Sequence, residues 1–162
     1  MKPEELEFLV QSNYIEQVYD EIHMRAAKAA WNFLKKQDRL TTKVILQTHK
    51  KLMVKHLPLN QRGKWRLCNV KVGIYDPPDR YQVPSMMDWW IKDANQTISG
   101  TPRKAEEIIK QDHITFERIH PFVDGNGRVG RMLLNWQRLQ VGLPILVIKA
   151  SHRWEYYDWW AQ

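Results

Sequence analysis

Residues 120–131 read HPFVDGNGRVGR and directly follow a long segment with helical periodicity. Two glycines flank Asn126, and a second helical pattern begins near that residue. The stretch therefore predicts a tight turn that leads into a helix, because glycine permits backbone conformations that other residues avoid. The first N–H groups of a helix lack helical partners and attract anions. This turn predicts a phosphate-binding nest.

Charged side chains surround the predicted nest. Arg128 and Arg131 are three positions apart, so their guanidinium groups fall on one side of the first helical turn and can bind further phosphate oxygens. Asp124 offers a carboxylate of the kind that holds Mg²⁺ together with phosphates. His120 carries an imidazole that can accept a proton near neutral pH. A base, a metal ligand and a phosphate cradle together predict phosphoryl or nucleotidyl transfer.

Most of the remaining chain has the periodicity of amphipathic helices, and a length of 162 residues suits one compact domain. Residues 64–84 differ, because they are richer in Val, Ile, Tyr and Trp and contain a DPPD turn. They predict a small β-hairpin, with an irregular loop as the alternative. The predicted helices cover residues 3–36, as one helix or as two joined by a slight break, and residues 41–53, 84–98, 102–119 and 126–142, with a short last helix after Ser151.

Composition narrows the class of protein. A net charge of +7 favours contact with nucleic acid, nucleotide phosphates or an acidic partner, without choosing among them. Residues 50–66 are strongly basic, and we interpret them as a solvated face. The N-terminus lacks a signal-peptide pattern and no window has the roughly twenty apolar residues of a membrane span, so we expect a cytoplasmic protein. The single cysteine, Cys68, excludes an internal disulfide, and we expect a buried, inert thiol.

The stretch at residues 120–131 resembles the Fic-domain motif, His-Pro-Phe-x-Asp/Glu-Gly-Asn-Gly-Arg-x-x-Arg, at every specified position. The likeness extends to flanking segments such as GKWR, VKVG and LLNWQRLQVGLP, from about residue 12 to residue 157. The resemblance implies a mainly α fold: a single-domain Fic-type helical bundle over residues 1–162 with a small β-hairpin flap. Its implied parts are an N-terminal inhibitory helix at about residues 5–35, the flap at about residues 69–84 and an active-site loop at residues 120–131.

The resemblance also implies an activity, the transfer of AMP from ATP to a hydroxyl side chain of a target protein with release of pyrophosphate. His120 would deprotonate a Ser, Thr or Tyr hydroxyl, and Asp124 would hold Mg²⁺. Modification of the protein by itself, and assembly into an oligomer, are also open. The backbone at Gly125 and Gly127 and the Asn126 side chain would bind the α- and β-phosphates. Arg128 and Arg131 would bind the outer phosphates. Strand-like docking of the target would use four flap residues, Val70, Lys71, Val72 and Gly73.

A second motif lies near the N-terminus. Residues 12–17, SNYIEQ, resemble the family's inhibitory motif Ser/Thr-x-x-x-Glu-Gly/Asn. Ser12 and Glu16 are four apart and share a helical face. By resemblance, Glu16 would pair with Arg131 and occupy the cation that the γ-phosphate of ATP needs. Gln17 departs from the Gly or Asn of the pattern, and the alternative interpretation is an exposed glutamate on an amphipathic helix.

Two other functions remain open at this level. A Fic-type enzyme can use another nucleotide or remove AMP with the same residues. A non-enzymatic adaptor for nucleic acid or protein would use the positive charge and the many aromatic residues. No recognised nucleic-acid motif is present, so nucleic acid is the less favoured partner.

Overall fold

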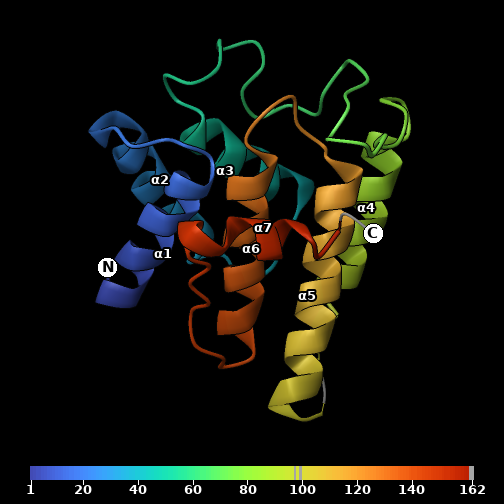
Figure 1. The fold of residues 1–162 in the computed structure, drawn as a ribbon. Helices are drawn as coiled ribbons and strands as arrows, with labels where there is room; N and C mark the ends of the chain where they lie inside the picture. The colour runs from blue at the N-terminus through green and yellow to red at the C-terminus, as the bar shows by residue number, and fades with distance from the viewer. Residues whose placement is uncertain (97, 99, 161–162) are drawn as a thin grey trace.

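The computed structural model describes residues 1–96, 98 and 100–160. These residues form a helical bundle, and none of them belongs to a β-sheet, which confirms the predicted mainly α fold class (Figure 1). The elements are α1 (Pro3–Ile15), α2 (Glu21–Leu34), α3 (Thr42–Leu52), α4 (Val83–Ala94), α5 (Pro102–Ile119), α6 (Asn126–Gln140), the 3-10 turn η1 (Ala150–His152) and α7 (Arg153–Tyr157).

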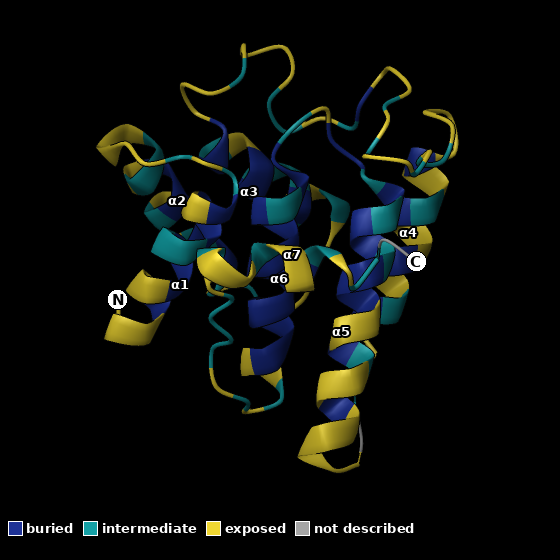
Figure 2. Ribbon diagram, viewed as in Figure 1, coloured by how far each residue is buried: buried dark blue, intermediate teal, exposed yellow. Residues whose placement is uncertain are grey.

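Helix α6 is the central element of the bundle. Helices α1, α2, α3 and α5 all contact it, and Figure 2 shows α6 buried along most of its length. Large apolar side chains from the surrounding helices, among them Trp31, Trp90 and Phe116, complete one core cluster. Because the N-terminus of α6 emerges from this rigid core, the loop that precedes it is held in a fixed position. Within the described residues, no helix has both the length and the hydropathy of a membrane span.

The N-terminal segment forms two helices rather than one. Helix α1 ends at Ile15, and Gln17 adopts a left-handed backbone with φ 58°. Asp20 then caps α2, because its side chain accepts a hydrogen bond from the His23 amide at 3.0 Å. Helix α4 ends at Ala94, earlier than predicted, and part of the predicted extension, Thr97, lies outside the described residues.

The segment between α3 and α4 is mostly irregular. Val72 and Tyr75 exchange two backbone hydrogen bonds of 2.9 Å around a turn in which Gly73 has φ 58°. The predicted hairpin is thereby reduced to a single antiparallel bridge, since Pro77 and Pro78 follow and have no N–H to donate. The prediction of a buried cysteine was wrong: Cys68 is exposed in this loop, because the loop is anchored through hydrogen bonds rather than by burial of its side chains.

Candidate functional site

The loop between α5 and α6 is shaped by its own residues. His120 caps α5 in the left-handed region, with φ 50° and ψ 61°, and so reverses the chain. Two residues later the Phe122 ring is fully buried, stacked on His49 at 3.8 Å between ring centroids and tilted against Trp65 at 5.2 Å. Phe122 therefore anchors the loop in the core.

Asn126 closes this loop. The Phe122 amide donates to Asn126 Oδ1 at 2.8 Å, and Asn126 Nδ2 donates to the Phe122 carbonyl at 2.9 Å. Gly125 has φ 83°, and a Cβ there would lie 2.6 Å from Met53 Sδ, so the position requires glycine. Both polar atoms of the Asn126 side chain thus form hydrogen bonds within the loop, and Nδ2 carries a second N–H that these bonds do not use. The first turn of α6 has no capping side chain, so its N–H groups remain open for an anion.

Asp124 presents its carboxylate at the entrance to this turn. Its Oδ1 accepts from the Gly125 amide at 2.6 Å, its Oδ2 lies 2.9 Å from His56 Nε2, and its carbonyl pairs with His49 Nε2 at 3.0 Å. The side chain is about half exposed. No group of three or more His, Cys, Asp and Glu side chains suited to a metal occurs within residues 1–96, 98 and 100–160. The carboxylate nevertheless fits Mg²⁺, which commonly takes one or two protein carboxylates and completes its shell with phosphates and water.

A chain of hydrogen bonds connects Asp124 with the start of α2. His56 Nδ1 lies 3.0 Å from His23 Nε2, and His23 Nδ1 lies 2.5 Å from Asp20. The chain links the two imidazoles to a carboxylate at each end. Burial lowers the pKa of His56.

Arg128 is a buried cation, 2% exposed, that forms no salt bridge with any residue the structure describes, although the charges of Asp124 and Glu16 act to raise its pKa. Its Nη2 donates to Met53 Sδ at 3.5 Å. Nε and Nη1 have no partner. Burial lowers the pKa of this guanidinium, which reflects the cost of desolvating an unpaired charge. A bound anion would relieve that cost.

Arg131 is also buried, but each of its three guanidinium nitrogens has a hydrogen-bond partner. Nη2 lies 2.6 Å from Glu16 Oε1 and 3.0 Å from the Ser12 carbonyl, Nε donates to Ser12 Oγ at 2.9 Å, and Nη1 donates to the Tyr156 hydroxyl at 3.1 Å. Although burial alone would lower the pKa of Arg131, Tyr156 and Glu16 raise it above its ordinary value. The ion pair expected between Glu16 and Arg131 is therefore present.

His120 lies between the loop and a cavity. Its Nδ1 contacts the Glu117 carbonyl at 3.3 Å, which leaves Nε2 as the nitrogen available to a substrate. Burial lowers the pKa of His120, so the ring is neutral near pH 7 and can accept a proton.

The cavity beside His120 has a volume of about 440 Å³ and is lined by His120, by Glu16 just after α1 and by residues 72–75 of the predicted flap. Asp124 and Arg128 do not line it, and they contact His56 and Met53 in the segment that follows α3. Of the four flap residues predicted to dock a target, Val72 and Gly73 line it. The lining residues are Glu16, Val72, Gly73, Ile74, Tyr75, Glu117, His120, Gly127, Arg131, Tyr157 and Trp160.

Sequence reasoning missed two residues of this site. Arg66 is buried and donates to the carbonyls of His120 at 2.8 Å, Cys68 at 2.9 Å and Pro78 at 2.5 Å, so it ties the loop to the base of the flap. The segment GKWR pointed to this region without giving Arg66 a role. Glu117 lies on the cavity wall with Oε1 unpartnered, and burial raises its pKa to about 8. It was hidden within an ordinary helical pattern.

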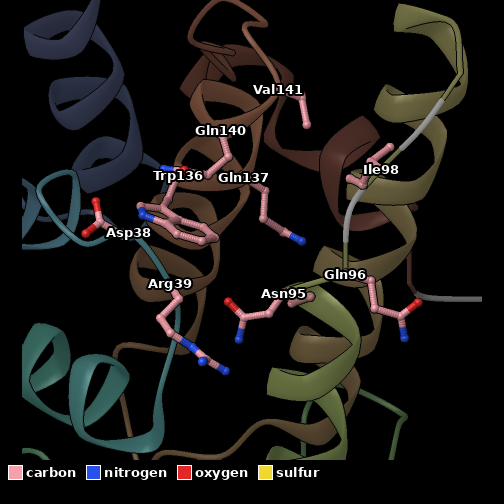
Figure 3. Close-up of a pocket in the computed structure, with 10 residues that line it drawn as sticks. Asp38, Arg39, Asn95, Gln96, Ile98, Trp136, Gln137, Gln140 and Val141 are labelled. Carbon is pink, nitrogen blue, oxygen red and sulfur yellow. The ribbon is translucent and has the colours of Figure 1, made fainter.

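A second cavity lies elsewhere, towards the C-terminal end of α6. Figure 3 shows Trp136 and Gln137 of α6 facing Arg39 and Asn95 across it. Its volume is about 600 Å³, but none of the predicted catalytic, phosphate-binding or inhibitory residues lines it. The candidate site is therefore the smaller cavity beside His120.

Comparisons with known proteins identify relatives of this chain. Residues 39–137 match the model of the Fic/DOC family. A Culex quinquefasciatus relative named protein adenylyltransferase Fic is 32% identical over 127 residues, which is 76% of this chain and 24% of the relative. A Caenorhabditis elegans relative, protein adenylyltransferase fic-1, is 31% identical over 127 residues, again 76% of this chain and 24% of the relative. This chain thus spans about a quarter of the length of these relatives.

Solved structures show the same fold. A Fic-1 fragment from C. elegans superposes with a TM-score of 0.81 at 23% identity, covering 98% of this chain and 55% of that one. A Fic-domain signalling protein from Bacteroides thetaiotaomicron gives a TM-score of 0.78 at 23% identity, covering 98% and 74%.

Proposed function

The chain belongs to the Fic/DOC family, and we propose that it is a protein adenylyltransferase that transfers AMP from Mg-ATP to a hydroxyl side chain of a target protein. Two relatives that carry this name support the proposal. In this proposal residues 1–162 act as one Fic-like domain. The N-terminal helix inhibits it and residues 69–84 serve as the flap.

The unpaired guanidinium of Arg128 is the observation that carries the proposal. A fully buried cation with two free donor groups is costly unless an anion binds there. Next to it, the uncapped first turn of α6 offers backbone N–H groups and the positive end of the helix dipole. Together they form a cradle for the phosphates of a nucleotide.

The proposed reaction uses His120 and Asp124, which lie in the loop that leads into this cradle. The target hydroxyl loses its proton to His120 Nε2, and its oxygen forms a bond to the α-phosphorus while the bond to pyrophosphate breaks. The protein contributes orientation and fixed positive charge, which are the main sources of catalysis in phosphoryl transfer. Asp124 would hold Mg²⁺, which neutralises charge on the phosphates when bound.

Inhibition in this proposal rests on Glu16. Its carboxylate takes the Arg131 Nη2 donor that an outer phosphate would otherwise use. A Cβ at Gly127 would meet Glu16 Oε1, so the carboxylate also lies against the first turn of α6. ATP would then bind with its outer phosphate displaced from the productive position.

The target would dock at the flap. The bridge between Val72 and Tyr75 lies on the wall of the same cavity as His120. The exposed backbone around Lys71 and Gly73 can pair with an extended target segment. The same chemistry can act on a hydroxyl of this chain itself.

The test is intact mass after incubation with Mg-ATP and a mixture of candidate proteins. The Glu16→Gly variant should acquire AMP, or transfer it, faster than the native chain. His120→Ala should bind ATP but transfer none. Parallel reactions with GTP, CTP and UTP identify the nucleotide. An AMP adduct that forms equally well in His120→Ala would overturn the assignment of the base.

A further inference from the structure

A continuous basic groove lies on the outer side of the segment that joins α3 to the flap. Two adjoining depressions share Leu46, Gly63 and Lys64 and so form one channel, here called the basic groove. It follows α3 and continues to the residues at the base of the flap. The lining residues are Thr42, Lys43, Leu46, Gln47, Lys50, Leu59, Arg62, Gly63, Lys64, Trp65, Arg66, Leu67, Arg80, Tyr81 and Pro84.

The charges of the basic groove are of one sign. Lys43, Lys50, Lys64 and Arg80 are exposed cations on its lining, and no Asp or Glu residue lines either depression. Lys43, Lys50 and Lys64 form no salt bridge with the residues that the structure describes. The electrostatic field in such a channel attracts acidic groups.

Large apolar side chains stand between these cations. Leu59 is 69% exposed, Leu67 is 82% exposed and Tyr81 is 77% exposed. Exposed apolar side chains that gather in one groove mark an interaction site, whereas single ones carry no such meaning. The basic groove therefore fits a partner that combines acidic and apolar groups.

The groove reaches residues 80–84 of the flap segment and contacts the loop of the candidate active site, although it shares no lining residue with the cavity beside His120. The Trp65 ring on its floor contacts Phe122 of the catalytic loop at 5.2 Å, and Arg66 Nε donates to the His120 carbonyl at 2.8 Å. At the other end, Arg80 Nη1 donates to the Leu67 carbonyl at 2.9 Å, which closes the base of the flap. In Figure 1 the loops between α3 and α4 lie above the α5–α6 loop, and Figure 2 shows them largely exposed. A chain that docks at the flap can continue into the groove.

We propose that the basic groove binds an acidic segment of the target protein that carries large apolar residues and adjoins the hydroxyl to be modified. The proposal rests on the proposed function for the identity of the partner as a target. A peptide is favoured over a nucleic acid because Leu59 and Leu67 are aliphatic and offer no face on which bases stack. The exposed Tyr81 ring already has the Arg80 guanidinium over it, 4.6 Å from the ring centroid. Its acidic groups would pair with Lys43, Lys50 and Lys64, and its apolar side chains would contact Leu59 and Leu67.

Binding can be measured without catalysis. The probe is a fluorescein-labelled peptide of about 12 residues that alternates Glu with Leu and Phe, long enough to span about 40 Å when extended. Fluorescence anisotropy gives its Kd for the full chain without nucleotide. The comparison probes are a peptide with Lys in place of Glu and a single-stranded oligonucleotide of similar length.

The decisive variant carries Lys43→Glu and Lys64→Glu. It should weaken binding of the acidic peptide by about tenfold or more, whereas the matched variant Lys36→Glu with Lys92→Glu has the same change in net charge and should have little effect. Equal loss in both variants would show non-specific attraction and overturn the proposal. Tighter binding of the oligonucleotide or of the lysine peptide than of the acidic peptide would also overturn the proposal.

His120→Ala should bind the acidic peptide as tightly as the native chain. Binding that is retained in a protein without transferase activity would leave the groove standing even if the proposed function failed. Conversely, transfer of AMP without any binding of the acidic peptide would refute the groove alone.

Discussion

The ion pair between Glu16 and Arg131 allows stability and inhibition to be tested with one substitution. Glu16 Oε1 lies 2.6 Å from Arg131 Nη2, and the Glu16 side chain is 32% exposed while that of Arg131 is buried. A hydrogen bond to a charged group contributes about 1.5–3 kcal/mol, and partial exposure reduces this contribution through solvent screening. We therefore expect Glu16→Gln to lower the free energy of unfolding by about 1–2 kcal/mol.

The same substitution should increase AMP transfer. An outer phosphate of ATP competes with Glu16 for Arg131 in this proposal. Loss of about 1–2 kcal/mol from the Glu16–Arg131 interaction should therefore favour the productive nucleotide pose by about 5–30-fold. Urea denaturation measures the change in stability, and the initial rate of AMP incorporation measures the change in transfer. Both measurements use the same protein preparation at one pH and salt concentration.

Ser12→Ala is the matched control. It removes the hydroxyl that accepts from Arg131 Nε at 2.9 Å but keeps the carboxylate of Glu16. We expect a loss of about 0.5–1.5 kcal/mol in stability with little increase in transfer. A Glu16→Gln protein that is less stable but transfers AMP at the native rate would refute the inhibitory role of Glu16. Unchanged stability would refute the magnitude assigned to the pair.

Three further outcomes are expected. Gln17→Gly should raise the free energy of unfolding by about 0.5–1 kcal/mol in urea denaturation, because φ is 58° at Gln17 and glycine tolerates that backbone; a loss of stability would contradict this. The pKa of Glu117 is raised by burial to about 8, so the folded protein keeps a proton that the unfolded chain releases, and native stability falls as pH rises from about 4.5 to 8. Glu117→Gln should therefore gain about 1–3 kcal/mol relative to the native chain across that window; parallel pH curves for the two proteins would disprove the raised pKa. His56→Leu should weaken the binding of Mn²⁺ in the presence of a non-hydrolysable ATP analogue by about tenfold, measured by electron paramagnetic resonance, since His56 orients Asp124. His56→Gln keeps a hydrogen-bond donor and should lose less affinity. Equal loss in both variants would argue against hydrogen bonding as the cause.

Local sequence features predicted the elements that depend on local chemistry. The turn at Gly125 needs a left-handed backbone, which glycine adopts freely, and the helix before Pro121 ends because that proline restricts the preceding residue. Ser12 and Glu16 share a face because of helical spacing. The contact of Glu16 with Arg131, 115 positions away, was implied by the resemblance to the inhibitory motif and does not follow from the spacing.

Contacts between distant segments could not be predicted in this way. Arg66 bonds the carbonyl of His120, 54 positions away, and no periodicity marks an arginine that binds carbonyls rather than carboxylates. The exposure of Cys68 depends on that anchoring of its loop. The two hydrogen bonds by which the Asn126 side chain closes the loop on Phe122 depend on how Phe122 packs in the core, which local spacing does not show.

Under the proposed function, the different hydrogen bonding of the two arginines explains how the site can be inhibited without being blocked. Arg128 has two nitrogens without a hydrogen-bond partner, whereas each guanidinium nitrogen of Arg131 has one. Among the described residues that hydrogen-bond Arg131, Glu16 provides the carboxylate, and the other groups are a carbonyl and two hydroxyls. An incoming phosphate therefore has to displace one carboxylate and not the whole helix α1, which stays anchored because Phe8 and Leu9 are buried in the core. Under the proposed function, activation is then a local rotation of the Glu16 side chain. Helix α1 itself stays in place, because its packing in the core opposes a larger movement.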